Sequence, residues 1–208
     1  IENGYIKVPK LKTKIRIKQH RNFVGEIKSC TISKTKTNKY YISILVDIDI
    51  KPLPKRDNKV GIDLGLKEFA ICSDGYRVPN PKFLRRTEKC IKFLQRSLSR
   101  KQKGSSNRDK ARLKLAKAYE KLTNQRKDFL HKLSTKLINE NQVIVIEDLK
   151  VSNMVKNHKL AKAISEVSWY EFRTLLTYKA QWYGRELIIA HGNYASSQLC
   201  HVCGYKNA

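Results

Sequence analysis

Two acidic residues of this sequence are placed where metal-dependent chemistry would need them. Asp63 lies inside the apolar stretch 60–64, with a glycine two positions away on either side, and Glu147 directly follows the apolar stretch 143–146. A carboxylate in an apolar strand is costly unless it is paired or binds a cation. Mg²⁺ prefers carboxylate oxygens and keeps waters that phosphate oxygens can replace. The pair therefore predicts a Mg²⁺ site for cutting phosphodiester bonds.

Each carboxylate also has a purely structural interpretation. Asp63 could cap a turn at a strand end, because aspartates often bond to nearby backbone groups. Glu147 and Asp148 could be a solvated pair in an ordinary transition from strand to loop. The glycines around Asp63 favour a ligand site, since residues two apart share a face of a strand and glycine leaves that face open. In open α/β sheets, ligands bind at the carboxyl ends of strands, where Glu147 is expected.

A second candidate metal site lies near the end of the sequence. Cys200 and Cys203 are two residues apart and are followed by a glycine, which provides half of a tetrahedral Zn²⁺ site. A redox-active pair is the alternative, but it would be expected in a thioredoxin-like βαβ setting. Either His191 or His201 could complete a zinc site. A second cysteine pair, which this sequence lacks, is the favoured completion.

The charge of the chain indicates its partners. There are 44 Lys and Arg residues against 18 Asp and Glu, which gives a net charge of +26. Such a surplus favours phosphate polyanions, because binding releases their condensed counterions. An anionic membrane would also attract it, but no apolar run approaches the roughly 18 residues of a membrane span, and no signal peptide opens the chain. The five cysteines are scattered, which indicates a reducing, cytoplasmic setting.

The elements that must hold these residues alternate between strands and helices. Helical spacing of apolar residues predicts a basic helical hairpin over 82–140 and a helix over 163–183 that ends at Gly184. Residues 151–160 are expected to form a polar loop. Strands are expected in the first fifty residues and at 60–64, 68–72, 142–146 and 186–190. This order predicts an α/β fold with a mixed sheet, similar to the RNase H-like fold.

Several other residues have ordinary structural explanations. Aromatic residues of the helix over 163–183 are expected in the core, although a base-stacking platform is the alternative. Three cysteines are expected to be small buried apolar residues. The basic hairpin, together with His20 and Arg21, is expected to form a phosphate track, with solvated faces as the alternative. The aromatic residues are Trp169, Tyr170 and Trp182, and the cysteines are Cys30, Cys72 and Cys90.

In combination, these motifs resemble TnpB, the OrfB-type protein of prokaryotic insertion elements that is related to type V CRISPR effectors. The first fifty residues are similar to the end of that family's wedge β-barrel. The stretch GIDLGL resembles the first RuvC motif and IEDL resembles the second. The matching segments are 61–66, 146–149, 150–160, 168–173, 183–187 and 196–200.

The resemblance implies an RNA-guided DNA endonuclease, called a transposase in older terms. It would pair a guide RNA from the transposon end with target double-stranded DNA and cut that DNA with Mg²⁺. Asp63 and Glu147 would be catalytic metal ligands, and Cys200 and Cys203 would be two of four Zn²⁺ ligands. The implied domains are a partial wedge barrel over 1–54, a RuvC nuclease core over 55–192 containing the hairpin, and the start of a zinc ribbon over 193–208.

The sequence also departs from the family pattern. The third RuvC motif with its catalytic aspartate, the second cysteine pair and the N-terminal helical region are not found in it. We therefore expect a fragment, truncated at both ends, that cannot cleave DNA by itself. One alternative is a nuclease-dead, RNA-guided DNA-binding regulator, against which the retained Asp63 and Glu147 argue. Another is a structural nucleic-acid binder that uses charge alone, which guide-dependent sequence selection would exclude.

Overall fold

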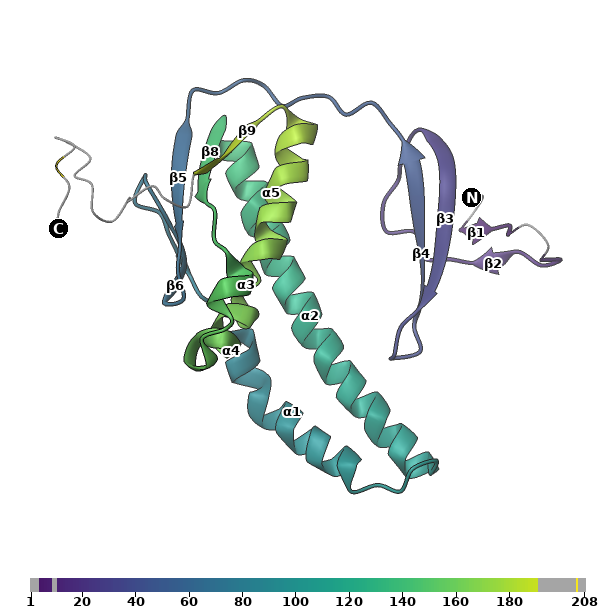
Figure 1. Ribbon diagram of the computed structural model, residues 1–208. Helices are drawn as coiled ribbons and strands as arrows, with labels where there is room; N and C mark the ends of the chain where they lie inside the picture. Colours follow the sequence, from purple (N-terminus) through teal and green to yellow (C-terminus); the bar gives the residue numbers. More distant parts are fainter. Residues whose placement is uncertain (1–3, 9–10, 191–204, 206–208) are drawn as a thin grey trace. The chain divides into compact units, whose positions relative to one another are not determined.

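The structure is a computed structural model that describes residues 4–8, 11–190 and 205. It divides into two compact units, Ile1–Asp49 and Ile50–Ala208, shown in Figure 1. The candidate zinc ligands Cys200 and Cys203, as well as His191 and His201, lie outside the described residues. The zinc site therefore stays a prediction.

The N-terminal unit consists of two small antiparallel pairs of strands. β1 (Tyr5–Ile6) pairs with β2 (Ile15–Arg16), and β3 (Glu26–Lys34) pairs with β4 (Tyr40–Asp47). The β3–β4 turn is closed by Asn38, whose φ of 62° is one that asparagine tolerates better than most residues. The predicted strands are present, while the described residues of this unit form two separate sheets and no closed barrel.

A five-stranded mixed sheet forms the centre of the second unit. Its order is β7-β6-β5-β8-β9, and β8 runs parallel to both β5 and β9, whereas β6 and β7 are antiparallel. This confirms the mixed α/β architecture. The short strand β7 is an addition to the expected elements. The bounds are β5 (Lys59–Leu64), β6 (Glu68–Cys72), β7 (Arg77–Pro79), β8 (Val143–Glu147) and β9 (Glu186–Ala190).

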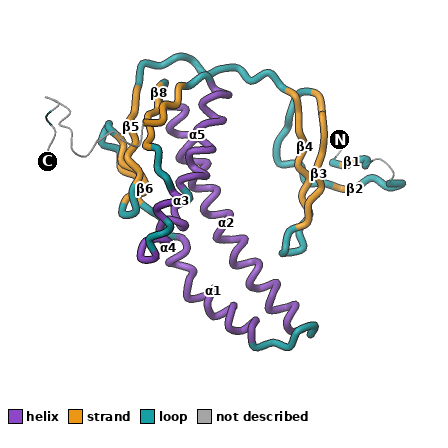
Figure 2. Tube along the Cα trace, viewed as in Figure 1, coloured by secondary structure: helices purple, strands orange, loops and turns teal. Residues whose placement is uncertain are grey.

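The predicted helical hairpin consists of α1 (Phe83–Ser99) and α2 (Ser106–Glu140). Ser105 caps α2 by accepting a hydrogen bond from the backbone N–H of Arg108. The Arg108 guanidinium in turn donates to the carbonyls of Leu98 and Lys101, which fixes the connection between the helices. Figures 1 and 2 show that only the C-terminal part of α2 reaches the sheet and that the hairpin extends beyond it.

The segment after β8 differs from the sequence-based expectation. Residues 151–160 are not a loop: α3 (Val151–Met154) and the start of α4 (His158–Val167) occupy them. The helix expected over 163–183 is broken at Ser168, whose φ of 56° ends α4 and begins α5 (Trp169–Tyr183). The prediction that Gly184 ends the helix is confirmed, since its φ of 65° is the left-handed conformation that glycine adopts readily.

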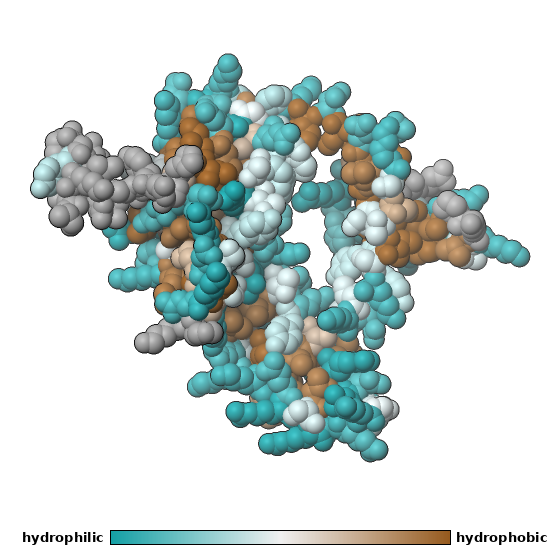
Figure 3. Space-filling model, viewed as in Figure 1, coloured by the Kyte–Doolittle hydropathy of each residue, from teal (hydrophilic) through white to brown (hydrophobic). Residues whose placement is uncertain are grey.

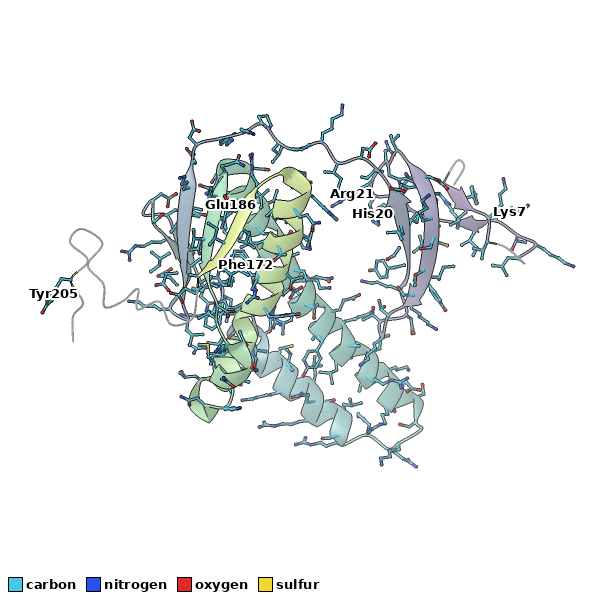
Figure 4. All side chains as sticks on the ribbon, turned by 45° about the horizontal axis from the view of Figure 1, so that its top comes forward. Lys7, His20, Arg21, Phe172, Glu186 and Tyr205 are labelled. Atoms are coloured by element: carbon cyan, nitrogen blue, oxygen red, sulfur yellow. The ribbon has the colours of Figure 1, made fainter. Side chains whose placement is uncertain are left out.

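The core lies between the sheet and the two helices α2 and α5. Phe172 of α5, labelled in Figure 4, is fully buried and packs edge-on against Phe69 of β6, with ring centroids 5.2 Å apart. Lys179 is also buried there, and its Nζ donates to the His131 carbonyl and the hydroxyls of Ser134 and Thr135. This buried cation joins α5 to α2 without an acidic partner among the residues described.

Several exposures differ from the expectation. Trp182 is 48% exposed and Tyr170 is 76% exposed, so neither belongs to the core, whereas Trp169 does. Cys72 is buried as expected, but Cys30 and Cys90 are exposed. In the part of the chain that the structure describes, no helix combines the length and the apolar character needed to cross a membrane.

Candidate metal centre

Asp63 and Glu147 lie side by side at the carboxyl ends of two neighbouring parallel strands. Ile62 of β5 is paired with Ile146 of β8, so the next residue along each strand brings the two acidic side chains together. Neighbouring strands are about 5 Å apart. Because Ile62 and Ile146 are buried against the helices, alternation turns both carboxylates toward the opposite face of the sheet.

The electrostatics of the pair favour a bound cation. Asp63 is exposed and Glu147 is half-buried. Within the residues that the structure describes, neither carboxylate has a hydrogen-bond or salt-bridge partner. Desolvation, followed by the neighbouring Asp63 charge, raises the pKa of the Glu147 carboxyl above its usual value. Two adjacent, uncompensated carboxylates fit a hard cation such as Mg²⁺, since carboxylate oxygens are the ligands it prefers.

The neighbouring Asp148 has a different environment. Its Oδ1 accepts a hydrogen bond from Arg173 Nη1 of α5 at 2.6 Å, and its backbone N–H donates to the carbonyl of Ala190 at 3.3 Å. The ion pair connects the end of β8 to the first turns of α5. The structure thus separates the two consecutive acids, leaving Glu147 beside Asp63 and holding Asp148 against the helix.

Of the two glycines around Asp63, only Gly65 is required by the backbone. A Cβ on Gly65 would come within 2.9 Å of the Glu68 carbonyl, so the tight β5–β6 turn needs a glycine there. A Cβ on Gly61 would meet the Ser73 side chain at an ordinary 3.8 Å. The Gly61 N–H already donates to the Ser73 hydroxyl. The glycine argument for a ligand site is therefore weaker than the sequence suggested, and the site depends on the carboxylates.

The sequence matches two known family models. The model of the OrfB_IS605 family, described as probable transposase, matches residues 41–158, which is more than half of the chain and includes both carboxylates. The chain belongs to the OrfB_IS605 family. The Cas12f1-like TNB domain matches residues 169–208.

Curated relatives carry consistent names. A "Putative RNA-guided DNA endonuclease" of Streptomyces pristinaespiralis is 46% identical over 180 residues, covering 86% of this chain and 45% of the relative. The Escherichia coli (strain K12) protein "Putative RNA-guided DNA endonuclease InsQ" is 34% identical over 220 residues, covering 98% of this chain and 54% of the relative. The chain thus spans about half the length of these members of the family.

A solved structure shows a distant similarity. The Cas12f1 chain in a Cas12f1-sgRNA-target DNA complex has a TM-score of 0.49 and 16% identity, covering 86% of this chain and 45% of that chain.

Sequence reasoning missed two features near the end of β8. Arg173 had no assigned role, yet it holds Asp148, and Tyr170 was expected in the core, yet it is exposed. Arg173 was noticed only as part of a segment that resembles the family. No periodicity distinguishes the two residues, because their position depends on how α5 meets the end of β8.

Proposed function

We propose that this chain is the RuvC-type nuclease core of an RNA-guided DNA endonuclease, with an RNase H-like fold. The observation that supports this most directly is the placement of Asp63 beside Glu147 on neighbouring parallel strands. The names of the curated relatives point in the same direction. The chemistry would be metal-dependent cleavage of DNA phosphodiester bonds at positions selected by base pairing with the guide.

In this proposal, Asp63 and Glu147 share the task of binding and orienting the catalytic cation. A bound Mg²⁺ would activate a water as nucleophile and stabilise the leaving oxygen. Arg173 acts indirectly: by holding Asp148, it fixes the backbone at the end of β8 and therefore the direction in which Glu147 points. The third carboxylate implied by the family resemblance is not among the described residues, so these two acids form part of the ligand set.

The basic surfaces support nucleic-acid partners. The hairpin region 83–140 holds 18 Lys and Arg residues but only 5 Asp and Glu residues, and Figure 3 shows hydrophilic side chains crowded around its far end. We propose that this surface contacts the phosphates of the guide RNA or of target DNA. The β1–β4 unit, with the exposed His20 and Arg21 of Figure 4, is proposed as part of an RNA-binding wedge barrel.

Cys200 and Cys203 are proposed as two ligands of a structural Zn²⁺ site. The support is their spacing and the following glycine, together with the match of residues 169–208 to a Cas12f1-like domain. Zinc content measured on the purified protein, compared with a Cys200→Ser variant, tests this directly. Equal zinc in both proteins would contradict it.

The decisive experiment measures guided cleavage by the protein expressed from its intact gene. We expect Asp63→Asn and Glu147→Gln each to lower the cleavage rate about 10³-fold or more, because each removes a ligand of the cation that carries the chemistry. Both variants should still bind guide RNA and target DNA. Mn²⁺ binding, followed by electron paramagnetic resonance, should weaken in the same variants and gives a readout independent of cleavage.

Glu186→Gln is the matched control. Glu186, labelled in Figure 4, is an exposed acid at the start of β9, opposite Val143 and therefore at the other end of the sheet from Glu147. The Glu186→Gln protein should cleave DNA at the same rate as the unaltered protein. Full cleavage by Glu147→Gln would overturn the proposal. Guided binding by the unaltered protein without any cleavage would support the nuclease-dead regulator instead.

A further inference from the structure

The linker between the two units is attached to the second unit over much of its length. β4 ends at Asp47 and β5 begins at Lys59, and residues 48–58 between them form neither helix nor strand. Leu53 nevertheless packs against the core of the second unit, and its backbone N–H donates to the carbonyl of Tyr183 at 3.1 Å. The linker is therefore fixed from Leu53 onward.

A single buried arginine makes the strongest of these attachments. Arg185, the residue before β9, is only 7% exposed. Its Nη1 donates to the Pro54 carbonyl at 2.9 Å and to Gln142 Oε1 at 2.7 Å, and its Nε donates to the Ile138 carbonyl at 3.0 Å. Burying a guanidinium is costly unless its donors are satisfied, and the planar guanidinium satisfies them in several directions at once. Arg185 thus joins the linker to the end of α2 and the start of β8.

Gln142 completes the attachment. Its Oε1, which accepts from Arg185, also accepts from the backbone N–H of Arg56 at 3.2 Å. Its Nε2 donates to the Gly184 carbonyl at 3.0 Å, and its backbone N–H donates to the Asn58 carbonyl at 2.8 Å. We call Arg185, Gln142 and linker residues 53–58 the linker clamp.

The path of the linker also depends on the glycine that ends α5. A Cβ on Gly184 would lie 3.0 Å from the Cβ of Pro52, which is closer than an ordinary contact. Gly184 therefore has two roles: its φ of 65° ends the helix, and its missing side chain lets the linker cross the end of α5 just before the clamp.

The linker clamp shortens the joint between the two units. Without it, residues 48–58 would be free, whereas with it only residues 48–52 precede the first hydrogen bond at Leu53. An extended chain spans about 3.4 Å per residue, so the reach of the joint falls from about 37 Å to about 17 Å. Effective concentration falls roughly as the −3/2 power of tether length, so the clamp raises it about threefold.

We propose that Arg185 is a positioning residue that determines where the second unit cuts DNA, by limiting how far the first unit can move from it. This role rests on the proposed function, in which the first unit binds RNA and the second cuts DNA. A longer joint would present the guide-paired DNA to Asp63 and Glu147 in more than one register. Arg185 precedes Glu186, which pairs with Val143 at the other end of β8 from Glu147, so it acts through the linker.

Trypsin measures the linker clamp directly, because Lys55 and Arg56 lie inside it. In the intact protein, Arg185→Ala should speed cleavage after these two residues roughly 10-fold or more, since proteolysis follows local opening. Gln142→Ala should have the same effect while leaving the bond from Arg185 to the Ile138 carbonyl in place. Mass spectrometry of the fragments identifies the cleaved bonds.

The functional readout is the distribution of cut positions in guided cleavage, mapped by sequencing the product ends. Arg185→Ala and Gln142→Ala should each broaden that distribution about twofold, in keeping with the change in reach. Arg185→Lys keeps the charge without the planar geometry, so its distribution should be intermediate. A loss of stability alone would lower the amount of active protein without moving the cut positions, so the breadth separates positioning from a merely structural role.

Arg77→Ala is the matched control, because it removes an exposed arginine from β7, at the opposite edge of the sheet. It should change neither trypsin cleavage of the linker nor the cut positions. If Arg185→Ala leaves the linker resistant, or exposes it without broadening the cut positions, the positioning role is wrong while the nuclease stands. If the unaltered protein does not cleave DNA, the proposed function fails and the positioning role fails with it.

Discussion

The two units of this protein use similar strand sequences with very different results. β4 alternates between a more exposed and a less exposed face, yet none of its eight residues is fully buried. β5 has six residues, and three of them are buried against helices α2 and α5. Figure 3 shows hydrophobic side chains at the surface of the β1–β4 unit. Its large exposed apolar residues include Ile27, Ile32, Tyr40, Tyr41 and Leu45.

The difference shows that a strand pattern specifies pairing but not a core. Two paired strands have no second layer, and an isolated hairpin is only marginally stable in water. In the second unit, α2 and α5 provide that layer, so the same alternation buries one face and presents the other. Asp63 and Glu147 are held firmly because their strands are anchored through the buried face.

The core of the second unit should be far more sensitive to truncation than the apolar surface of the first. Phe172→Ala, at a fully buried site, should lower the free energy of unfolding by about 3–5 kcal/mol. Ile32→Ala, at a side chain that is 49% exposed, should change it by no more than about 0.5 kcal/mol. Urea unfolding followed by circular dichroism reports both units, and tryptophan fluorescence reports the second unit alone, because both tryptophans lie in α5. Equal losses from the two variants would contradict the contrast.

The buried lysine of the second unit should make the next largest contribution. Lys179→Ala removes the shared donor from Ser134, Thr135 and the His131 carbonyl, which should cost about 1–3 kcal/mol of unfolding free energy. Lys179→Met keeps the aliphatic stem and removes only the charge and its hydrogen bonds, so it should lose less. Urea unfolding at neutral pH measures both, and a larger loss in the methionine variant would refute the packing argument.

The same lysine should make the free energy of unfolding rise with pH. Burial lowers the Lys179 pKa from its usual 10.5. Between the folded value and 10.5, the unfolded chain binds more protons than the native chain, so stability rises with pH across that window. The difference in unfolding free energy between wild type and Lys179→Met should therefore shift in favour of wild type as pH is raised. A shift in the opposite direction would show that burial does not disfavour the charged form of Lys179.

A smaller effect is expected where α4 caps α1. Glu166 Oε1 accepts hydrogen bonds from the backbone N–H groups of Leu84 and Arg85. The Glu166 carboxylate thereby caps α1, since the side chain of Lys82 at the N-cap position does not. Glu166→Ala should cost about 1 kcal/mol, as for other lost helix caps. Glu166→Gln keeps an acceptor and should cost less. Hydrogen exchange of the first α1 amides should accelerate in the alanine variant, and unchanged exchange would argue against the cap.

The smallest effect should come from the exposed ion pairs of Glu88 with Lys92 and Lys162. Hydrogen bonds from Lys162 and then Lys92 lower the pKa of Glu88 to about 2. Its contribution is therefore present above the unfolded carboxyl pKa and disappears as pH falls toward 2. Glu88→Gln should lower Tm only slightly at low salt and not measurably at high salt, since exposed pairs are screened. A Tm difference that persists in high salt would contradict this.

Local signals were enough to predict much of the second unit. The strands around Asp63 and Glu147 were recognised from short apolar runs, and the end of α5 from Gly184. That both carboxylates serve one metal site was also predicted, because ligands of open α/β sheets bind at the carboxyl ends of strands. These features depend on neighbours along the chain, which the sequence displays.

Other features could not be read in this way. The break at Ser168 has no proline or glycine to announce it, and the exposure of Cys90 and Trp182 depends on which face of each helix packs against neighbouring elements. The role of Gly65 depends on the carbonyl of Glu68 across a tight turn. In each case, the feature depends on a contact that forms only when the chain folds, and such a contact leaves no periodic pattern in the sequence.

The strands, the hairpin, the large positive charge and the two acids at strand ends can be read from the sequence, since periodicity and composition act locally. That Glu147 lies beside Asp63 while Asp148 binds Arg173 becomes visible only in the folded chain. The same holds for Tyr170, which lines one cavity together with Glu147. The physical reason is that charge balance and burial are set by the groups that folding brings near, and those groups come from distant parts of the chain.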